Sequence, residues 1–196
     1  SKMSLMPDWR TAKLMLQQVA NRADHTILGA VAEEFEKEGM HVGSVLDYCP
    51  ELLVQRGCLT RREPNEDQWA DIRYAWPMIK EIAAMQIGQT IVLRDRAVVA
   101  VESIDGTDAT LRRGGELARG KAVAVKVSKK GHDPRFDIPT LGPDTVTAMA
   151  ESGVQVFAVE AGGTLLLDPD EVRRRADKAG VSILAITEDD ITEEAP

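Results

Sequence analysis

Apolar and polar residues alternate most regularly in one valine-rich stretch near the middle of the sequence. Val123, Val125 and Val127 are separated by alanine or lysine, and this β-branched run of period two predicts a strand. The pattern breaks at the Lys-Lys-Gly sequence 129–131, and a helix is expected to begin near Pro143, because proline is favoured in the first helical turn. A charged loop therefore joins a strand to a helix start, as in many α/β enzymes that handle phosphate or metal ions.

The hydrophobic pattern of the rest of the C-terminal half predicts an α/β domain with a mixed sheet. The strands at 90–93 and 97–102 are expected to form a hairpin with its turn at 94–96. The strands at 154–159 and 164–167 are expected to form a second, hairpin-like pair. A last strand is expected at 181–186 and helices at 67–85, from 107 or 108 onward, from 143 to about 151, and at 169–179.

The N-terminal half predicts helices up to about residue 19 and after Asp24, the second ending at Gly39, followed by a strand over 40–48. A parallel strand needs neighbours, so we expect further sheet before Ser1. The predicted organisation is the remainder of an N-terminal domain at 1–50, a linker at 51–64, a C-terminal α/β domain at 65–190 and a frayed acidic tail at 191–196.

Composition narrows the classes of function. The chain is 43% hydrophobic and 29% charged, as expected for a globular protein, and its net charge of −8 argues against nucleic-acid binding. We expect no signal peptide, and the sequence contains no apolar run of membrane-spanning length. Cys49 and Cys58 fit no metal-binding spacing and are expected to be reduced thiols, so we predict a cytoplasmic location.

The loop after the valine-rich strand carries Asp133, Arg135 and Asp137 on alternate positions. In an extended segment these three side chains would point to the same side, with the guanidinium between two carboxylates. The alternative is a salt-bridged surface turn in which Arg135 only neutralises its neighbours. Spacing does not decide between the two interpretations.

Further charged residues follow the ends of neighbouring predicted strands, where α/β sheets gather their ligand sites. Together, the carboxylates would suit a divalent metal ion and the two cationic side chains a phosphate group. Taken singly, each acidic residue also fits a surface role, and Asp108 fits the role of a helix cap. The group consists of Glu102, Asp105, Asp108, Asp133 and Asp137 with Lys126 and Arg135.

Seven segments, in order along nearly the whole chain, resemble the LpxI-type UDP-2,3-diacylglucosamine pyrophosphatases, bacterial enzymes of lipid A synthesis. The most specific blocks contain Gly106-Thr107-Asp108 and Arg135-Phe136-Asp137. One departure is His132, where the family usually has glutamine. The segments are 7–10, 31–39, 50–53, 87–108, 112–117, 132–146 and 159–168.

The resemblance implies a Rossmann-like N-terminal domain, whose beginning is missing here, and a substrate chamber between the two domains. It also implies Mg²⁺-dependent attack of water on the α-phosphorus, giving UMP and 2,3-diacylglucosamine 1-phosphate. The catalytic candidates are Asp133, Asp137 and Arg135; the substrate-binding candidates are Lys126, Thr107, Thr140, Asp24 and His25; the metal candidates are Asp133, Asp137, Glu102 and Asp108.

The two acyl chains of such a substrate need apolar surface, and peripheral contact with the inner membrane and homo-oligomerisation are both compatible with the sequence. The alternative for the apolar helix residues is core packing. Two other functions stay open: a non-catalytic nucleotide-sugar or lipid-binding module, and a different phosphohydrolase on a similar frame. The candidates for acyl-chain contact are Trp69, Trp76, Met78, Ile79, Ile82 and Met85.

Overall fold

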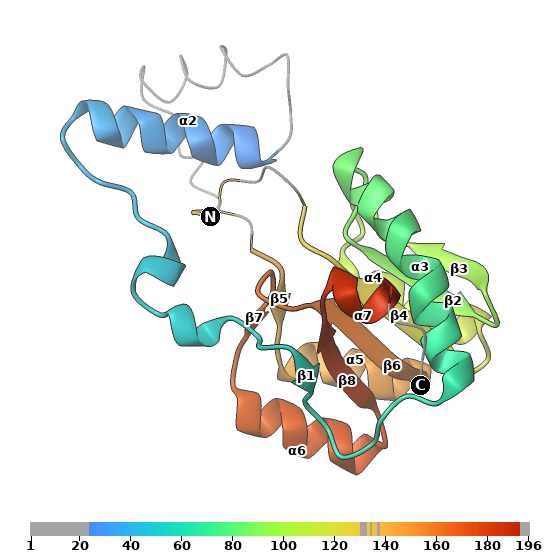
Figure 1. Cartoon of the computed structure of the whole chain (residues 1–196). Coiled ribbons are helices and arrows are strands. Elements are labelled where there is room, and N and C mark those ends of the chain that lie inside the picture. Colours follow the sequence, from blue (N-terminus) through green and yellow to red (C-terminus); the bar gives the residue numbers. More distant parts are fainter. Residues whose placement is uncertain (1–23, 130–132, 134, 137, 193–196) are drawn as a thin grey trace, which may run out of the picture. The chain divides into compact units, whose positions relative to one another are not determined.

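The computed structural model describes residues 24–129, 133, 135–136 and 138–192 (Figure 1). The chain divides into two compact units. The first consists of Ser1–Pro50 and His132–Asp137, and the second of Glu51–Gly131 and Ile138–Pro196.

In the first unit, helix α2 (Asp24–Lys37) is followed by Gly39, which adopts a positive φ of 81°, as a helix stop does. The prediction of a strand over 40–48 is wrong, because this segment contains the 3₁₀ helix η1 (Val45–Asp47). Ser44 Oγ accepts a hydrogen bond from the Leu46 amide at 3.2 Å, while the Ser44 amide donates to Asp47 Oδ2 at 2.8 Å. This reciprocal capping stabilises a helical turn at a place where alternating hydrophobicity favoured a strand.

In the described part of the second unit, six strands form one mixed sheet in the order β1-β8-β6-β4-β2-β3. The three central strands β4, β6 and β8 are parallel, whereas β2, β3 and β1 are antiparallel to their neighbours. The predicted mixed α/β sheet is therefore confirmed. The strands are β1 (Gly57–Cys58), β2 (Thr90–Arg94), β3 (Ala97–Val101), β4 (Ala122–Lys126), β6 (Val154–Glu160) and β8 (Ser182–Ile186).

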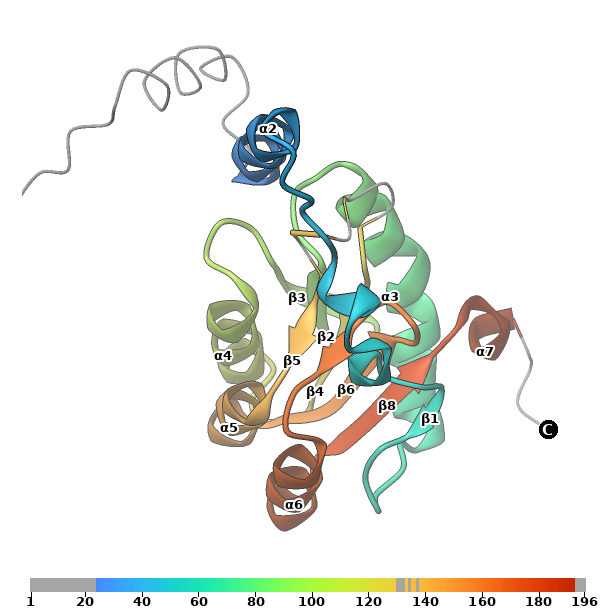
Figure 2. The ribbon, with the colours of Figure 1, turned by 90° about the vertical axis from the view of Figure 1, so that its left-hand side faces the viewer.

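Helices cover both faces of this sheet (Figure 2). On one face α3 (Glu66–Ala84) buries Ile72, Trp76 and Ile79 against side chains of the central strands, and α7 (Glu188–Thr192) packs nearby. The other face is covered by α4 (Thr107–Leu117), α5 (Pro143–Ser152) and α6 (Pro169–Ala179). Of the tail predicted to be frayed, Ile191 and Thr192 belong to α7, and residues 193–196 lie outside the described residues.

Two segments differ from their predicted places in the fold. The strand β7 (Leu165–Leu166) does not form a hairpin with β6; it pairs in parallel with β5 (Thr140–Leu141) in a separate two-stranded sheet. Residues predicted as a linker contribute the short helix η2 (Pro50–Leu52) and the edge strand β1, which pairs with β8. Strands of two residues carry too little periodicity to be predicted from sequence.

The hairpin of β2 and β3 turns at Asp95 and Arg96, as predicted. Both residues have positive φ values, 53° and 60°, which match the twist of a two-residue hairpin turn. The carboxylate of Asp71 on α3 accepts the backbone N–H groups of both turn residues. Burial raises the pKa of Asp71, although these hydrogen bonds act in the opposite direction.

Close helix packing explains the Gly114-Gly115 pair within α4. A Cβ atom on Gly114 would lie 2.7 Å from the Val92 side chain, and one on Gly115 would lie 2.3 Å from the backbone oxygen of Ser152. The pair therefore allows α4 to approach both β2 and α5.

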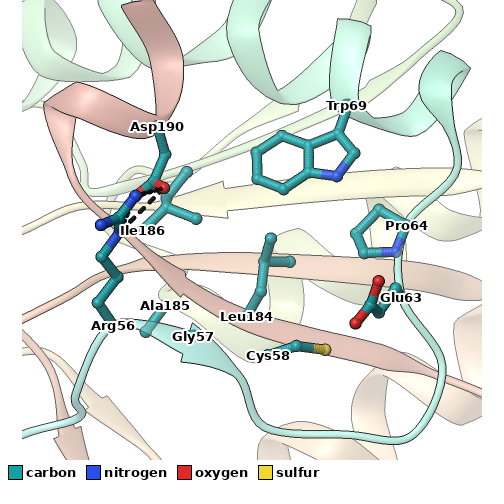
Figure 3. A pocket seen from close by; sticks show the side chains of 10 residues that line it. All are labelled: Arg56, Gly57, Cys58, Glu63, Pro64, Trp69, Leu184, Ala185, Ile186 and Asp190. Carbon is teal, nitrogen blue, oxygen red and sulfur yellow. Dashed lines mark hydrogen bonds and ion pairs between the residues drawn. The ribbon is translucent and has the colours of Figure 1, made fainter. Parts of the chain in front are cut away.

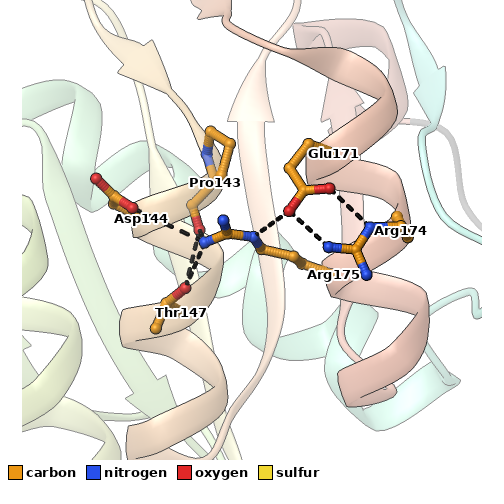
Figure 4. A network of polar contacts seen from close by, with 6 residues as sticks. All are labelled: Pro143, Asp144, Thr147, Glu171, Arg174 and Arg175. Carbon is orange, nitrogen blue, oxygen red and sulfur yellow. Dashed lines mark hydrogen bonds and ion pairs between the residues drawn. The ribbon is translucent and has the colours of Figure 1, made fainter.

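A charged network joins α5 to α6 (Figure 4). Glu171 accepts hydrogen bonds from Arg174 and Arg175, each at 2.7 Å, and Arg175 also donates to the Thr147 hydroxyl at 3.0 Å. The two arginines lower the pKa of Glu171 to about 2.

Candidate functional site

Three polar side chains form a hydrogen-bonded series where β4 ends. Lys126 Nζ donates to Thr107 Oγ1 at 2.7 Å, and the Thr107 hydroxyl donates to Glu102 Oε1 at 3.0 Å. The second oxygen of Glu102 accepts a hydrogen bond from the backbone N–H of Gln89 at 3.4 Å. Lys126 is only 7% exposed, so its charge is largely removed from water. The structure thus brings together three of the residues singled out from the sequence.

Backbone geometry positions this group. Lys126 is the last residue of β4 and pairs with Thr90 on β2 and Val159 on β6. The predicted cap of α4 at Thr107 or Asp108 is wrong: Gly106, at φ 80°, is the cap residue, and no side chain caps the helix. The Thr107 hydroxyl is therefore available to Lys126 and Glu102, and Asp108 lies in the first turn.

A second polar group lies at the end of β6, the parallel neighbour of β4. Glu160 accepts the amide and the hydroxyl of Ser128, at 2.8 and 2.7 Å, and forms an ion pair with Lys80 from α3. Burial acts to raise the pKa of Glu160, but the hydrogen bonds from Lys80 and Ser128 outweigh it, and the pKa is lowered. The carboxylate therefore remains charged and fixes the first residue of the loop that follows β4 and Val127.

Sequence reasoning missed Lys80 and Ser128 and gave Glu160 no role. Lys80 lies on a helix whose apolar period dominates the sequence signal, and its partner is 80 positions away. Lys80 also lies 5.1 Å from the centre of the Trp76 ring. Trp76 itself is 1% exposed and donates its indole N–H to Glu188 at 2.7 Å, so of the two interpretations for this residue, core packing is the one found.

In the first unit, Asp133 and Arg135 form a tight turn. Arg135 donates its amide to Asp133 Oδ1 at 3.0 Å and its guanidinium to both oxygens, with a shortest contact of 2.6 Å. The Phe136 amide donates to the Asp133 carbonyl at 3.1 Å, so Asp133 and Arg135 form the salt-bridged turn that the sequence left open, and not the extended arrangement. Arg135 also pairs with Glu36 of α2 at 2.7 Å. The hydrogen bonds from Arg135 lower the pKa of Asp133, and this pairing raises the pKa of Arg135.

The other predicted site residues have varied surroundings. Asp105 pairs with Arg113 at 2.8 Å and accepts the Ser103 amide, which is the main cause of its lowered pKa. Thr140 is exposed and donates to the Ile138 carbonyl at 3.2 Å. Asp24 begins α2, and its side chain and that of His25 lie outside the described residues, as do His132 and Asp137.

Metal coordination was expected from Asp133, Asp137, Glu102 and Asp108. Within the described residues, no three His, Cys, Asp or Glu side chains converge as a metal cage would require. Mg²⁺ needs fewer protein ligands, since it is held by one or two carboxylates with water and substrate phosphates. Glu102 accepts a single hydrogen bond on each oxygen, whereas both oxygens of Asp133 are held by Arg135.

A separate small cavity lies beside β1 and the end of β8 (Figure 3). Trp69, Pro64 and Leu184 line it, and Arg56 and Asp190 form an ion pair of 2.6 Å at one side. Cys58 is exposed there as a free cysteine, and Cys49 is also free. Trp69, a candidate for acyl-chain contact, lines this cavity, and none of the predicted catalytic, substrate-binding or metal residues does. In the part of the chain that the structure describes, no helix is both long and apolar enough to cross a membrane.

Comparison with known proteins gives a match over most of the chain. Residues 1–52 match the LpxI N-terminal domain and residues 55–184 the LpxI C-terminal domain. The UDP-2,3-diacylglucosamine pyrophosphatase LpxI of Caulobacter vibrioides is 35% identical over 193 residues, which are 93% of this chain and 69% of that protein.

Weaker similarities exist to two other proteins. The bifunctional purine biosynthesis protein PurH of Bacillus subtilis is 28% identical over 130 residues, covering 64% of this chain and 22% of PurH. Among solved structures, Acinetobacter baumannii RibD superposes with a TM-score of 0.38 at 16% identity, over 63% of this chain and 38% of RibD.

Proposed function

Because the chain belongs to the LpxI family, we propose that it hydrolyses the pyrophosphate bond of UDP-2,3-diacylglucosamine, releasing UMP and 2,3-diacylglucosamine 1-phosphate. The named activity of the Caulobacter relative, at 35% identity over 93% of this chain, supports this assignment. Such a reaction belongs to lipid A synthesis.

The observation that carries the proposal is the nearly buried cation of Lys126 at the carboxyl end of β4. A pyrophosphate brings negative charge to the place where parallel strands end, and a preorganised ammonium group with little water around it stabilises that charge strongly. Thr107 fixes the direction of the ammonium group by accepting one of its protons at 2.7 Å. Lys126 would therefore bind phosphoryl oxygens without reorganising during the reaction.

Oxygen ligands for Mg²⁺ are also available beside Lys126. Glu102 has acceptor capacity left on both oxygens, and Asp108 has no hydrogen-bond or ion-pair partner among the described residues. These two carboxylates are the kind of hard donors that Mg²⁺ prefers, and we propose that they hold the ion. A bound Mg²⁺ would neutralise charge on the diphosphate and lower the pKa of a nearby water molecule.

Asp133 fits a different role in this account. Its carboxylate is neutralised by Arg135, which itself contacts Glu36, so Asp133 acts by orienting the guanidinium. Arg135 presents a planar set of donors suited to phosphate oxygens. Asp137 remains the proposed water-activating or metal-binding carboxylate, as the family resemblance implies.

Incubation of the full chain with UDP-2,3-diacylglucosamine in ¹⁸O-labelled water tests the activity, the metal dependence and the point of attack together. We expect release of UMP with Mg²⁺ and none after a chelator is added. Attack on the α-phosphorus, which the resemblance implies, places the label in UMP; label in the sugar 1-phosphate would move the attack to the β-phosphorus. Equal rates with and without chelator would contradict the proposed metal dependence, and no UMP with Mg²⁺ would contradict the proposed activity.

A further inference from the structure

Thr90 carries a buried hydroxyl group that has no hydrogen-bond partner. The residue is 0% exposed, and within the described residues no donor or acceptor lies within hydrogen-bond distance of its Oγ1 atom. A buried polar group of this kind costs folding free energy, and most buried side-chain polar atoms in proteins are hydrogen-bonded. Valine has nearly the same shape without the hydroxyl and is favoured in strands. Packing alone therefore does not account for the hydroxyl of Thr90.

The sheet places Thr90 between the two charged groups of the candidate site. Thr90 is the first residue of β2 and pairs with Lys126 on β4, while its carbonyl oxygen accepts a hydrogen bond from the N–H of Glu102 at 2.8 Å. The three residues thus form one row across neighbouring segments of the sheet. Side chains alternate between the faces of a sheet, and the residues two positions away in each strand lie in the core cluster that α4 covers, so the row faces α4. These core residues are Val92, Ala124 and Ala100.

Thr107 at the start of α4 completes this row from the helix side. Its hydroxyl accepts from Lys126 Nζ and donates to Glu102 Oε1 at 3.0 Å. A hydroxyl has one proton, so Thr107 cannot donate to Glu102 and to a phosphoryl oxygen at the same time. The other hydrogen bond of Glu102, from the Gln89 amide at 3.4 Å, is long for an N–H···O contact. Glu102 would therefore lose its better donor if Thr107 turned to the substrate.

We propose that Thr90 is a positioning residue that replaces Thr107 as the donor to Glu102 when the diphosphate binds. The Thr107 hydroxyl, next to Lys126, then donates to a phosphoryl oxygen, and the Thr90 hydroxyl donates to the carboxylate. Side chains directly opposite each other in an antiparallel pair have Cβ atoms only about 4.5–5.5 Å apart, so side-chain rotation is sufficient. Glu102 keeps its place beside Lys126 throughout. This inference rests on the proposed function, because it needs a diphosphate at Lys126.

Calorimetric titration of the full chain with inorganic pyrophosphate, with and without Mg²⁺, tests the proposal by comparing Thr90→Val with Thr90→Ser. T90V keeps the shape of the side chain and removes the donor, whereas T90S keeps the donor. We expect the dissociation constant to rise about tenfold in T90V, as for the loss of a hydrogen bond to a charged group, and to change less than about twofold in T90S. Hydrolysis of UDP-2,3-diacylglucosamine should follow the same order through a higher KM in T90V.

Ser182→Ala is the matched control for a buried hydroxyl. Ser182 is also 0% exposed and is the first residue of β8, and its hydroxyl donates to the Arg62 carbonyl at 2.7 Å. Because β4, β6 and β8 are parallel, Ser182 lies at the opposite end of the sheet from Lys126. S182A should unfold at a lower temperature and bind pyrophosphate like the unsubstituted chain. T90V should unfold at no lower temperature than the unsubstituted chain, since valine removes an unpaired hydroxyl.

Equal affinity of T90V and the unsubstituted chain for pyrophosphate would overturn the inference. So would equal weakening in T90V and T90S, a T90V unfolding temperature as low as that of S182A, or the absence of pyrophosphate binding by the unsubstituted chain in both conditions. If pyrophosphate binds with the expected order but the unsubstituted chain releases no UMP, the proposed function fails while the role of Thr90 at a diphosphate site is supported.

Discussion

The pKa of a carboxylate in this molecule depends on the hydrogen-bond donors that surround it. Glu160 is held by Lys80 and by two donors of Ser128, and all three interactions favour its charged form. The acidic residue could be placed at a strand end from sequence, because the pattern before it predicts the strand. Its partners could not be predicted, since they depend on how α3 packs on the sheet.

Replacement of Glu160 by glutamine should destabilise the second unit by about 1–3 kcal/mol, because Lys80 would lose its counter-charge in a half-buried place. The side chains of Lys80 and Glu160 are 20% and 21% exposed, so solvent screening is limited. Urea denaturation measures the change. Glu151→Gln serves as the control, because Glu151 is 62% exposed and pairs with Arg112 only at 4.0 Å. A loss of stability in E151Q as large as that in E160Q would contradict this account.

Glu171 gives a prediction about pH. Its pKa falls from 4.5 to about 2 in the folded chain, so its pairing with Arg174 and Arg175 favours folding above pH 4.5. This contribution should disappear as the pH falls from about 4.5 to about 2, when the folded form takes up the proton. The stability difference between the unsubstituted chain and Glu171→Gln should therefore shrink over that range in acid denaturation experiments. A difference that stays constant down to pH 2 would refute the assigned cause.

At the scale of elements, local hydrogen bonding and close packing decided the places where periodicity misled. The segment around Ser44 forms a capped 3₁₀ turn, and the Leu165 strand pairs with β5 across the loop instead of folding back on β6. Similarly, Gly114-Gly115 suggests a weak helix in sequence, yet the pair is required by the approach of α5. The long amphipathic helix α3 and the valine-rich β4 were predictable because one periodic signal dominates each.

Gly115→Ala should destabilise the chain by about 1–3 kcal/mol, although alanine is the better helix former. The new Cβ would lie 2.3 Å from the Ser152 backbone oxygen, so α4 and α5 must separate. Gly29→Ala in α2 is the matched control, because its Cβ would meet no atom within 4 Å. Thermal denaturation should show a lower midpoint for G115A, and no decrease for G29A. A neutral G115A would mean that the two helices separate at no cost.

At the scale of the whole molecule, the class of fold followed from the sequence, while the order of strands did not. Strand order depends on crossovers between distant segments, and β1 is too short to give a signal. The rule that ligand sites gather at strand ends predicted the region of Lys126, Thr107 and Glu102, which the fold does bring together. The salt-bridged turn left open for Asp133 and Arg135 is the arrangement found.

The central claim is that the ammonium group of Lys126, at the carboxyl end of β4, binds the diphosphate of the substrate. The most direct test is steady-state hydrolysis of UDP-2,3-diacylglucosamine by Lys126→Met, with Lys121→Met, next to the opposite end of the same strand, as the matched control. We predict that kcat/KM falls about a hundredfold in K126M and is unchanged in K121M. Equal activity of K126M and the unsubstituted chain would contradict the account.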